Sequence, residues 1–123
     1  MMKKGTAMAR VGAGLMFLGV ALGAFGAHGL EDLLQENDRL DTWQTAVFYQ
    51  LIHAMAVWVL ALLAPERSKV ALCFALGVVV FSGSLYVLSL TNILWLGAIT
   101  PLGGLLFLGG WAALLIRPHN KDS

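Results

Sequence analysis

Apolar stretches long enough to cross a bilayer dominate this chain. The first covers about 7–27 and is interrupted only by Arg10, the second covers about 42–64 and ends before Pro65, and the third covers about 70–90. Each approaches or exceeds the ~20 consecutive apolar residues that a transmembrane helix requires. The pattern therefore predicts three membrane-spanning helices over these ranges.

A fourth apolar stretch, from Pro101 to Ile116, is shorter. At about 1.5 Å per residue it reaches only roughly 24 Å, so the span either thins the bilayer or begins near Leu96, and we predict it at about 97–116. No segment alternates apolar and polar residues over the length of a barrel strand, and open sheets cannot face lipid. The predicted fold is all-α: one domain over residues 1–123, an integral membrane four-helix bundle with short loops.

Composition supports the same class. Hydrophobic residues make up 59% of the chain and charged residues 12%, a balance that a soluble domain of this size could not hide from water. A cleaved signal peptide is the alternative interpretation of the first stretch, because Lys3 and Lys4 precede an apolar core. The uncharged run exceeds the ~7–15 residues usual for such a core, so we expect the first helix to be retained. Cys73 is the single cysteine, which excludes an intrachain disulfide.

The basic residues predict how the bundle is oriented. Only Arg39 lies between the first and second spans, and the connection between the third and fourth spans carries no charge. By the positive-inside rule, both termini are predicted to be cytoplasmic. The remaining basic residues lie before the first span, between the second and third, and after the fourth: Lys3, Lys4, Arg10, Arg67, Lys69, Arg117 and Lys121.

The acidic segment "LEDLLQENDRLD" connects the first two spans. Leu30, Leu33 and Leu34 are at helical spacing, which favours a short interfacial helix on the outer leaflet. A solvated loop that merely connects two spans fits equally well. The acidity argues against nucleic acid as a partner and against docking to anionic lipid by charge.

Two sequence signals mark where helices begin. Asp41 and Gln44 have the spacing of a capping box at the start of the second span. Thr100 and Pro101 provide a cap and a first-turn proline for the fourth. We therefore expect these two helices to be capped by side chains.

The stretch "GAFGAHGL" ends the first span with His28. An imidazole can meet the last free carbonyls of a helix, and Gly29 can adopt the left-handed conformation of a C-terminal cap. His28 lies within about 5 Å of the outer boundary of the membrane core and His53 about 10 Å deeper. The two histidines are too far apart to share a metal with ~2 Å bonds, so we expect His28 to end the helix and predict no metal site.

Small residues at helical spacing predict the helix-packing faces. Lipid removes the hydrophobic drive between helices, so close backbone approach becomes more important. The glycines expected to pack are Gly12, Gly19, Gly23 and Gly26 in the first span, Gly77 in the third, and Gly103 and Gly110 in the fourth.

Gln50 and His53 share one face of the second span, near the bilayer midplane. A histidine at this depth is a functional hypothesis by default, and three uses remain open: a haem ligand, a proton-accepting site, or a polar contact to a quinone-like or lipid ligand. The structural alternative is that both side chains bond to Ser82, Ser84 or Tyr86 of the third span and fix its register. The candidate polar face comprises Tyr49, Gln50, His53, Ser84 and Tyr86.

Motifs of catalysis are absent from the sequence. It contains no HExxH, no CxxC, no phosphate-binding loop and no nucleophile elbow. Every acidic residue is predicted to lie outside the hydrocarbon, which weakens the case for an enzyme and for an ion-coupled transporter. We therefore expect a non-enzymatic protein and assign no cofactor.

Four ordered motifs resemble a known family. "GAFGAHGL", "WQTAVFYQLIHA", "FSGSLYVLSL" and "LGAITPLGGLLFLGGW" follow the order and spacing of the small inner-membrane proteins of the YgdD/YwdK-like group, classed as domain of unknown function family four-two-three. The resemblance covers nearly the whole chain and implies four transmembrane helices in a bacterial inner membrane, but no biochemical activity. The residues that match its pattern are Gly26, His28, Trp43, Tyr49, Gln50, His53, Ser84, Thr100, Pro101 and Gly104.

These observations leave three functional hypotheses. The first is a small accessory, assembly or scaffold partner, or a homo-oligomer, that acts through helix contacts among membrane lipids. The second is a protein that binds a quinone, haem or lipid at the Gln50 and His53 face. The third is a minimal oligomeric transporter or channel, which ranks last because the spans lack a charged residue to guide an ion.

Overall fold

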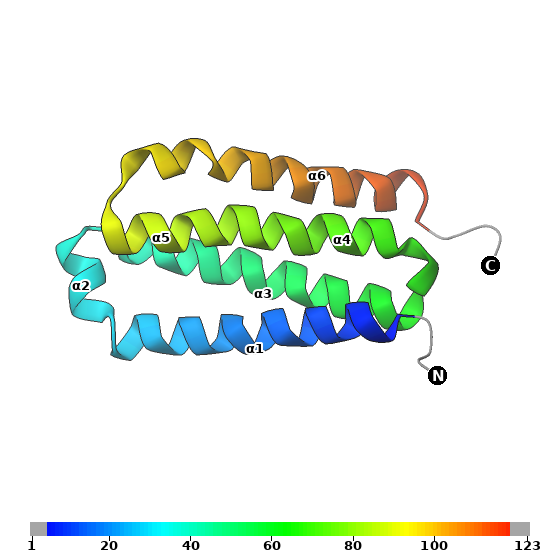
Figure 1. Ribbon diagram of the computed structural model, residues 1–123, viewed down its shortest axis with the longest axis horizontal. Coiled ribbons are helices and arrows are strands. Elements are labelled where there is room, and N and C mark those ends of the chain that lie inside the picture. The colour runs from blue at the N-terminus through cyan, green and yellow to red at the C-terminus, as the bar shows by residue number, and fades with distance from the viewer. Residues whose placement is uncertain (1–4, 119–123) are drawn as a thin grey trace.

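The computed structural model describes residues 5–118, which form helices joined by short turns (Figure 1). Four stretches are long and apolar enough to cross a membrane: Thr6–His28, Leu40–Leu63, Pro65–Thr91 and Leu94–Ile116. Each predicted span falls on one of these stretches. The fourth begins before Pro101, as the shortness of its apolar run suggested.

Nine helical elements make up these spans and their connections. Residues 68–91 form one continuous helix, in which α4 passes through the π-helical turn η2 into α5. The elements are α1 (Thr6–His28), α2 (Glu31–Glu36), α3 (Leu40–Leu63), the 3₁₀ turn η1 (Pro65–Arg67), α4 (Ser68–Gly77), η2 (Val78–Ser82), α5 (Gly83–Thr91), the 3₁₀ turn η3 (Leu94–Ala98) and α6 (Thr100–Ile116).

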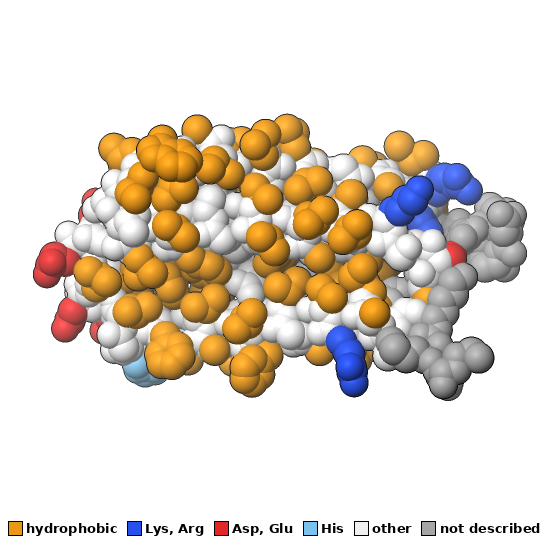
Figure 2. Space-filling model, in the orientation of Figure 1, with side chains coloured by type: hydrophobic (Ala, Val, Ile, Leu, Met, Phe, Trp, Pro, Cys, Tyr) orange, Lys and Arg blue, Asp and Glu red, His pale blue; other side chains and the backbone are white. Residues whose placement is uncertain are grey.

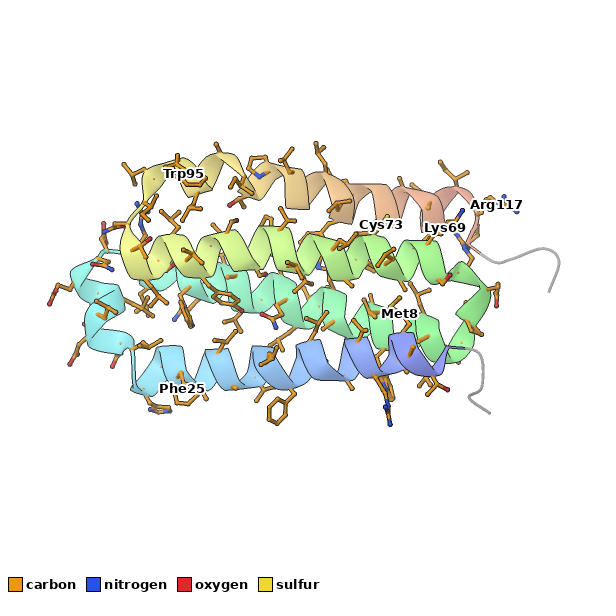
Figure 3. The ribbon with its side chains drawn as sticks, viewed as in Figure 1. Met8, Phe25, Lys69, Cys73, Trp95 and Arg117 are labelled. Carbon is orange, nitrogen blue, oxygen red and sulfur yellow. The ribbon has the colours of Figure 1, made fainter. Side chains whose placement is uncertain are left out.

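Charged side chains gather at the two ends of the bundle, and the flank between them is largely apolar (Figure 2). Acidic side chains lie at the end that carries α2, whereas Lys69 and Arg117 lie at the opposite end (Figure 3). Both described ends of the chain also lie at this basic end (Figure 1). Lys3, Lys4 and Lys121, which entered the prediction of orientation, lie outside the described residues.

The four spans form a bundle in which not every span packs on every other. α1 packs chiefly on α3, α3 also packs on α4, η2 and α5, and α6 packs on α4 and η2. Within the described chain, neither α1 and α6 nor α3 and α6 form an extensive backbone contact. The outer spans are therefore the least buried of the four.

Glycines of α1 allow the close approach of α3. A Cβ atom at Gly12 would lie 2.7 Å from the backbone nitrogen of Trp58, and one at Gly19 would lie 2.7 Å from a methyl group of Leu51. A Cβ atom at Gly26 would overlap the Trp43 indole. Each of these glycines therefore lies against bulky residues of α3. Gly23 is less constrained, because a Cβ atom added there would lie 3.2 Å from its nearest neighbour, a methyl carbon of Val47.

Glycines also bring α6 close to the third span. Gly103 abuts the backbone of Phe81, and a Cβ atom there would lie 2.8 Å from the Phe81 Cα. Gly77 accommodates the ring of Phe107, and Gly110 accommodates the ring of Phe74. The seven glycines expected to pack all lie in contact with another span.

The predicted side-chain caps of α3 and α6 are wrong. α3 begins at Leu40, so Asp41 lies inside its first turn, and neither Asp41 nor Gln44 forms the expected capping box. Residues 37–39 lead from α2 into α3, whose N-cap position is held by Arg39, and the first backbone bond of the helix joins Trp43 N–H to the Arg39 carbonyl at 2.9 Å.

At α6, Thr100 is the first helical residue rather than the cap. Its hydroxyl instead lies 2.6 Å from the Ser84 hydroxyl of α5. Pro101 lies in the first turn as predicted. The polar group that the sequence suggested for capping therefore joins two helices.

α1 ends at His28, but Gly29 does not adopt the left-handed cap. Its φ is −83°, and its N–H bonds to the Phe25 carbonyl at 2.8 Å. The right-handed turn continues because α2 begins only two residues later. Among residues 5–118, the His28 imidazole forms no hydrogen bond, so its predicted contact with the last carbonyls is also absent.

The acidic connection contains the short helix α2 and is tied to the end of α5. Leu34 is fully buried, so the apolar face of α2 closes the end of the bundle. Asn37 Nδ2 donates to the Ser89 carbonyl at 2.9 Å, and Arg39 Nε donates to the Asn92 side-chain oxygen at 2.8 Å. Of the two alternatives, a short helix or a solvated loop, the structure shows a helix over Glu31–Glu36.

Candidate intramembrane binding site

The five polar residues expected to form one face fall into three separate groups. Gln50 is buried and links three helices: its amide nitrogen donates to the Leu15 carbonyl of α1 at 2.8 Å, and its oxygen accepts from the Tyr86 hydroxyl of α5 at 2.5 Å. Gln50 and Tyr86 are therefore occupied by helix packing, as the structural alternative proposed.

Ser84 belongs to a different contact. Its hydroxyl faces Thr100 of α6 and also donates to the Phe81 carbonyl at 3.0 Å. Ser82 of η2 donates to the Ala46 carbonyl of α3 at 2.7 Å. Both serines therefore link spans through hydrogen bonds, but neither reaches His53.

His53 finds its partner on α6, and the prediction of a partner on the third span is wrong. Nδ1 lies 2.8 Å from the Tyr49 carbonyl, one turn earlier in α3, and Nε2 lies 2.9 Å from the indole nitrogen of Trp111. An indole nitrogen only donates, so Nε2 accepts this bond and Nδ1 carries the proton. Both ring nitrogens are satisfied in a neutral imidazole.

Aromatic rings surround His53 and fill the space between α3 and α6. The imidazole stacks on Phe107, with ring centroids 3.6 Å apart and planes 10° from parallel. Tyr49 is also nearly parallel to both rings, at centroid distances of 6.1 Å from His53 and 6.2 Å from Phe107. Phe81 is tilted against Tyr49 at 4.8 Å. These rings replace a direct backbone contact between the two helices.

A cavity of 330 Å³ lies beside these rings, between α3 and α6. Its size is at the lower end of the range for small-molecule sites, about 300–1,000 Å³. We call it the α3–α6 groove, and its lining residues are Tyr49, His53, Phe81, Gly104, Phe107, Leu108 and Trp111. None of them carries a formal charge at neutral pH, since the His53 imidazole is neutral.

The Tyr49 hydroxyl has no hydrogen-bond partner in the described part of the chain. Its side chain is 38% exposed beside the groove. Tyr49 lies nine residues after the start of α3, about 14 Å along the helix at 1.5 Å per residue. The hydroxyl is therefore placed deep in a span, where lipid offers it no acceptor.

Sequence reasoning missed the α6 side of this site. Gly104, Phe107, Leu108 and Trp111 recur at spacings of three and four residues, which places them on one face of a helix. That spacing was available as a signal. No signal in the sequence showed that this face lies close to Tyr49, because that proximity depends on how α6 packs on the third span.

Four apolar spans, charge confined largely to their ends and hydrogen-bonded polar groups between them define an integral membrane protein of the helical-bundle class. The model of the family described as "Protein of unknown function (DUF423)" matches residues 22–104. The chain belongs to this family, which confirms the resemblance seen in its motifs.

Relatives from several bacteria match most of the chain. The UPF0382 membrane protein YwdK of Bacillus subtilis is 46% identical over 113 residues, which cover 86% of this chain and 90% of the relative. The UPF0382 inner membrane protein YgdD of Escherichia coli is 40% identical over 105 residues, covering 81% and 79% respectively. No solved structure matches significantly. Together with the four spans, these relatives identify an integral protein of the bacterial cell membrane.

Proposed function

We propose that this protein binds a lipid-soluble molecule in the α3–α6 groove and that it acts by binding rather than by catalysis. The unpartnered Tyr49 hydroxyl carries the proposal. A polar group left without a partner away from water costs about 1–3 kcal/mol, and a ligand that accepts its hydrogen bond would remove that cost.

The lining of the groove suits a ligand that arrives from the bilayer. Leu108 and Trp111 are 66% and 43% exposed on the flank of α6, so the groove opens sideways towards lipid. Haem is a poor fit as an occupant, because an axial bond to iron would require Nε2 of His53 to release Trp111. The groove favours a smaller, uncharged molecule.

The charge distribution supports an orientation. We propose that the basic end, with Lys69 and Arg117, faces the cytoplasm, and that the acidic end with α2 faces outwards. Trp95, which is 66% exposed in η3, would then lie in the outer interfacial layer, where tryptophan is enriched. Both termini would be cytoplasmic.

An accessory or scaffold role through helix contacts is the second candidate. Its support is the large exposed area of α1, where Phe25 projects away from the bundle (Figure 3). However, the expected packing glycines face other helices of the same chain, so fewer small-residue faces remain for a partner. Crosslinking in native membranes tests this role, and recovery of monomer alone would argue against it.

Native mass spectrometry of protein released gently from its own membranes tests the binding role. Gly104→Leu is the blocking variant: the nearest atom to an added Cβ is 4.0 Å away, so a larger side chain enters the groove without disturbing the backbone. Gly109→Leu is the matched control, since it lies on α6 outside the groove with nothing within 4 Å.

We expect a small bound molecule in the wild-type protein and in Gly109→Leu, and its loss in Gly104→Leu. Thermal unfolding of all three proteins in the same micelles establishes that both variants fold. Absence of any bound molecule from folded wild-type protein, or equal retention in both variants, would contradict the proposal.

A further inference from the structure

The groove also constrains the chemistry of its ligand. We infer that the occupant is a neutral, flat ring that bears a carbonyl oxygen and a hydrocarbon tail, the chemistry of the quinone class, and that Tyr49 donates the hydrogen bond that holds it. This inference rests on the proposed binding role and specifies its ligand.

The walls of the groove favour a flat ring. Tyr49, His53 and Phe107 line the groove with ring planes within 10° of one another, His53 being stacked on Phe107, and Phe81 adds a ring tilted against Tyr49. Aromatic faces attract other planar rings in offset or edge-on arrangements. An acyl chain could fill this space but would make no ring–ring contact with these side chains.

The polar contact requires an acceptor at mid-membrane depth. His53 Nδ1 bonds to the Tyr49 carbonyl, and His53 Nε2 accepts from Trp111. Among the side chains of the described lining residues, the Tyr49 hydroxyl is therefore the polar group available to a ligand. The headgroup of a phospholipid lies at the interface and its chains offer no acceptor at this depth. A ring carbonyl supplies an acceptor on an otherwise apolar molecule.

The same lining selects against charge. No charged side chain lines the groove, since the His53 imidazole is neutral, and an isolated charge in hydrocarbon is costly. The sideways opening beside Leu108 leaves room for an attached tail to continue into the bilayer. A neutral ring with a hydrocarbon tail satisfies each of these conditions.

The test uses the full chain in nanodiscs loaded with a naphthoquinone that bears a short isoprenoid tail, and the isoprenoid alcohol of the same length serves as the ring-free comparison. Native mass spectrometry measures occupancy across a quinone titration. Tyr49→Phe, Gly104→Leu and the control Gly109→Leu are compared with the wild-type protein, and thermal unfolding in the same nanodiscs confirms that each variant folds.

We expect saturable binding of one naphthoquinone to the wild-type protein and to Gly109→Leu, and no saturable binding to Gly104→Leu. Tyr49→Phe should bind about tenfold more weakly, as the loss of one hydrogen bond predicts. The isoprenoid alcohol should bind more weakly than the quinone.

Two results would overturn the inference while the binding role stands: a native bound molecule that Gly104→Leu removes but that lacks a ring carbonyl, or naphthoquinone binding that is unchanged in Tyr49→Phe. If folded wild-type protein binds neither a native lipid-soluble molecule nor the quinone, the binding role itself fails. Equal loss in Gly104→Leu and Gly109→Leu would contradict the location of the site.

Discussion

The two sides of α3 are packed in different ways. Towards α1, glycines bring the helices together, and Trp43 and Gln50 donate to the carbonyls of Leu22 and Leu15 at 2.9 and 2.8 Å. Towards α6, aromatic rings hold the helices apart, and the polar link joins two side chains, His53 and Trp111. One helix therefore supports both a closed interface and an open one.

This difference separates residues that build the protein from residues that are available to a ligand. The Trp58 backbone beside Gly12 and the Trp43 indole beside Gly26 leave no room for an added side-chain atom. Aromatic spacing leaves the 330 Å³ cavity beside Phe107. Both sides contain polar residues, so the arrangement of partners, and not polarity alone, distinguishes packing from a candidate site.

The largest effect is expected at the closed interface. Gly12→Ala would place a methyl group 2.7 Å from the backbone nitrogen of Trp58. Because backbone atoms cannot move aside without separating α1 from α3, we expect a loss of about 2–3 kcal/mol in the free energy of unfolding, measured in mixed micelles. Gly14→Ala is the control, since nothing lies within 4 Å of its added Cβ. Equal stability of the two variants would show that this interface can relax.

A smaller effect is expected from the buried link at Gln50. Gln50→Leu removes the bond to Leu15 and leaves the Tyr86 hydroxyl without its acceptor. We expect a loss of about 1–2 kcal/mol in the free energy of unfolding. A double-mutant cycle with Tyr86→Phe should give a coupling energy of about 0.6 kcal/mol or more. A coupling energy of zero would mean that this hydrogen bond does not stabilise the fold.

The two tyrosines of the chain provide the sharpest comparison and the smallest effect. Tyr86→Phe should lower the free energy of unfolding by about 1 kcal/mol, because its hydroxyl bonds to Gln50. Tyr49→Phe should keep or raise the stability of ligand-free protein, because the hydroxyl lost has no partner among residues 5–118 and its removal relieves the cost of an unpaired polar group. Matched unfolding curves of the two variants measure both values, and an equal loss would remove the distinction between the two sides of α3.

Local pattern predicted the elements of the fold better than their contacts. Apolar length was sufficient to locate four spans, and leucine spacing suggested α2. The caps at Asp41 and Thr100 failed because a nearby helix or hydroxyl changes what a polar side chain can bond to. The turn η2 had no signal in the pattern, since a π turn adds one residue to a helix without interrupting its apolar run.

The candidate site was predicted only in part, for the same reason. The depth of Gln50 and His53 follows from counting residues along one helix. Tyr86, which bonds to Gln50, was one of three residues of the third span that the sequence offered as partners. Trp111 lies 58 residues after His53. Its role depends on where the packing of Gly103 against Phe81 places α6, and a single sequence does not record that distance.

Three of the hydrogen bonds between spans also follow the order in which the chain is made. Trp43 and Gln50 donate to carbonyls of α1, and Ser82 donates to a carbonyl of α3, so each side chain has its acceptor in a helix synthesised earlier. Synthesis proceeds from the N-terminus, and these groups enter a bilayer that already contains their partners. Two acceptors wait for a later span: the Gln50 oxygen waits for Tyr86 of α5, and His53 Nε2 waits for Trp111 of α6. α6 therefore satisfies the histidine and also forms the second wall of the groove.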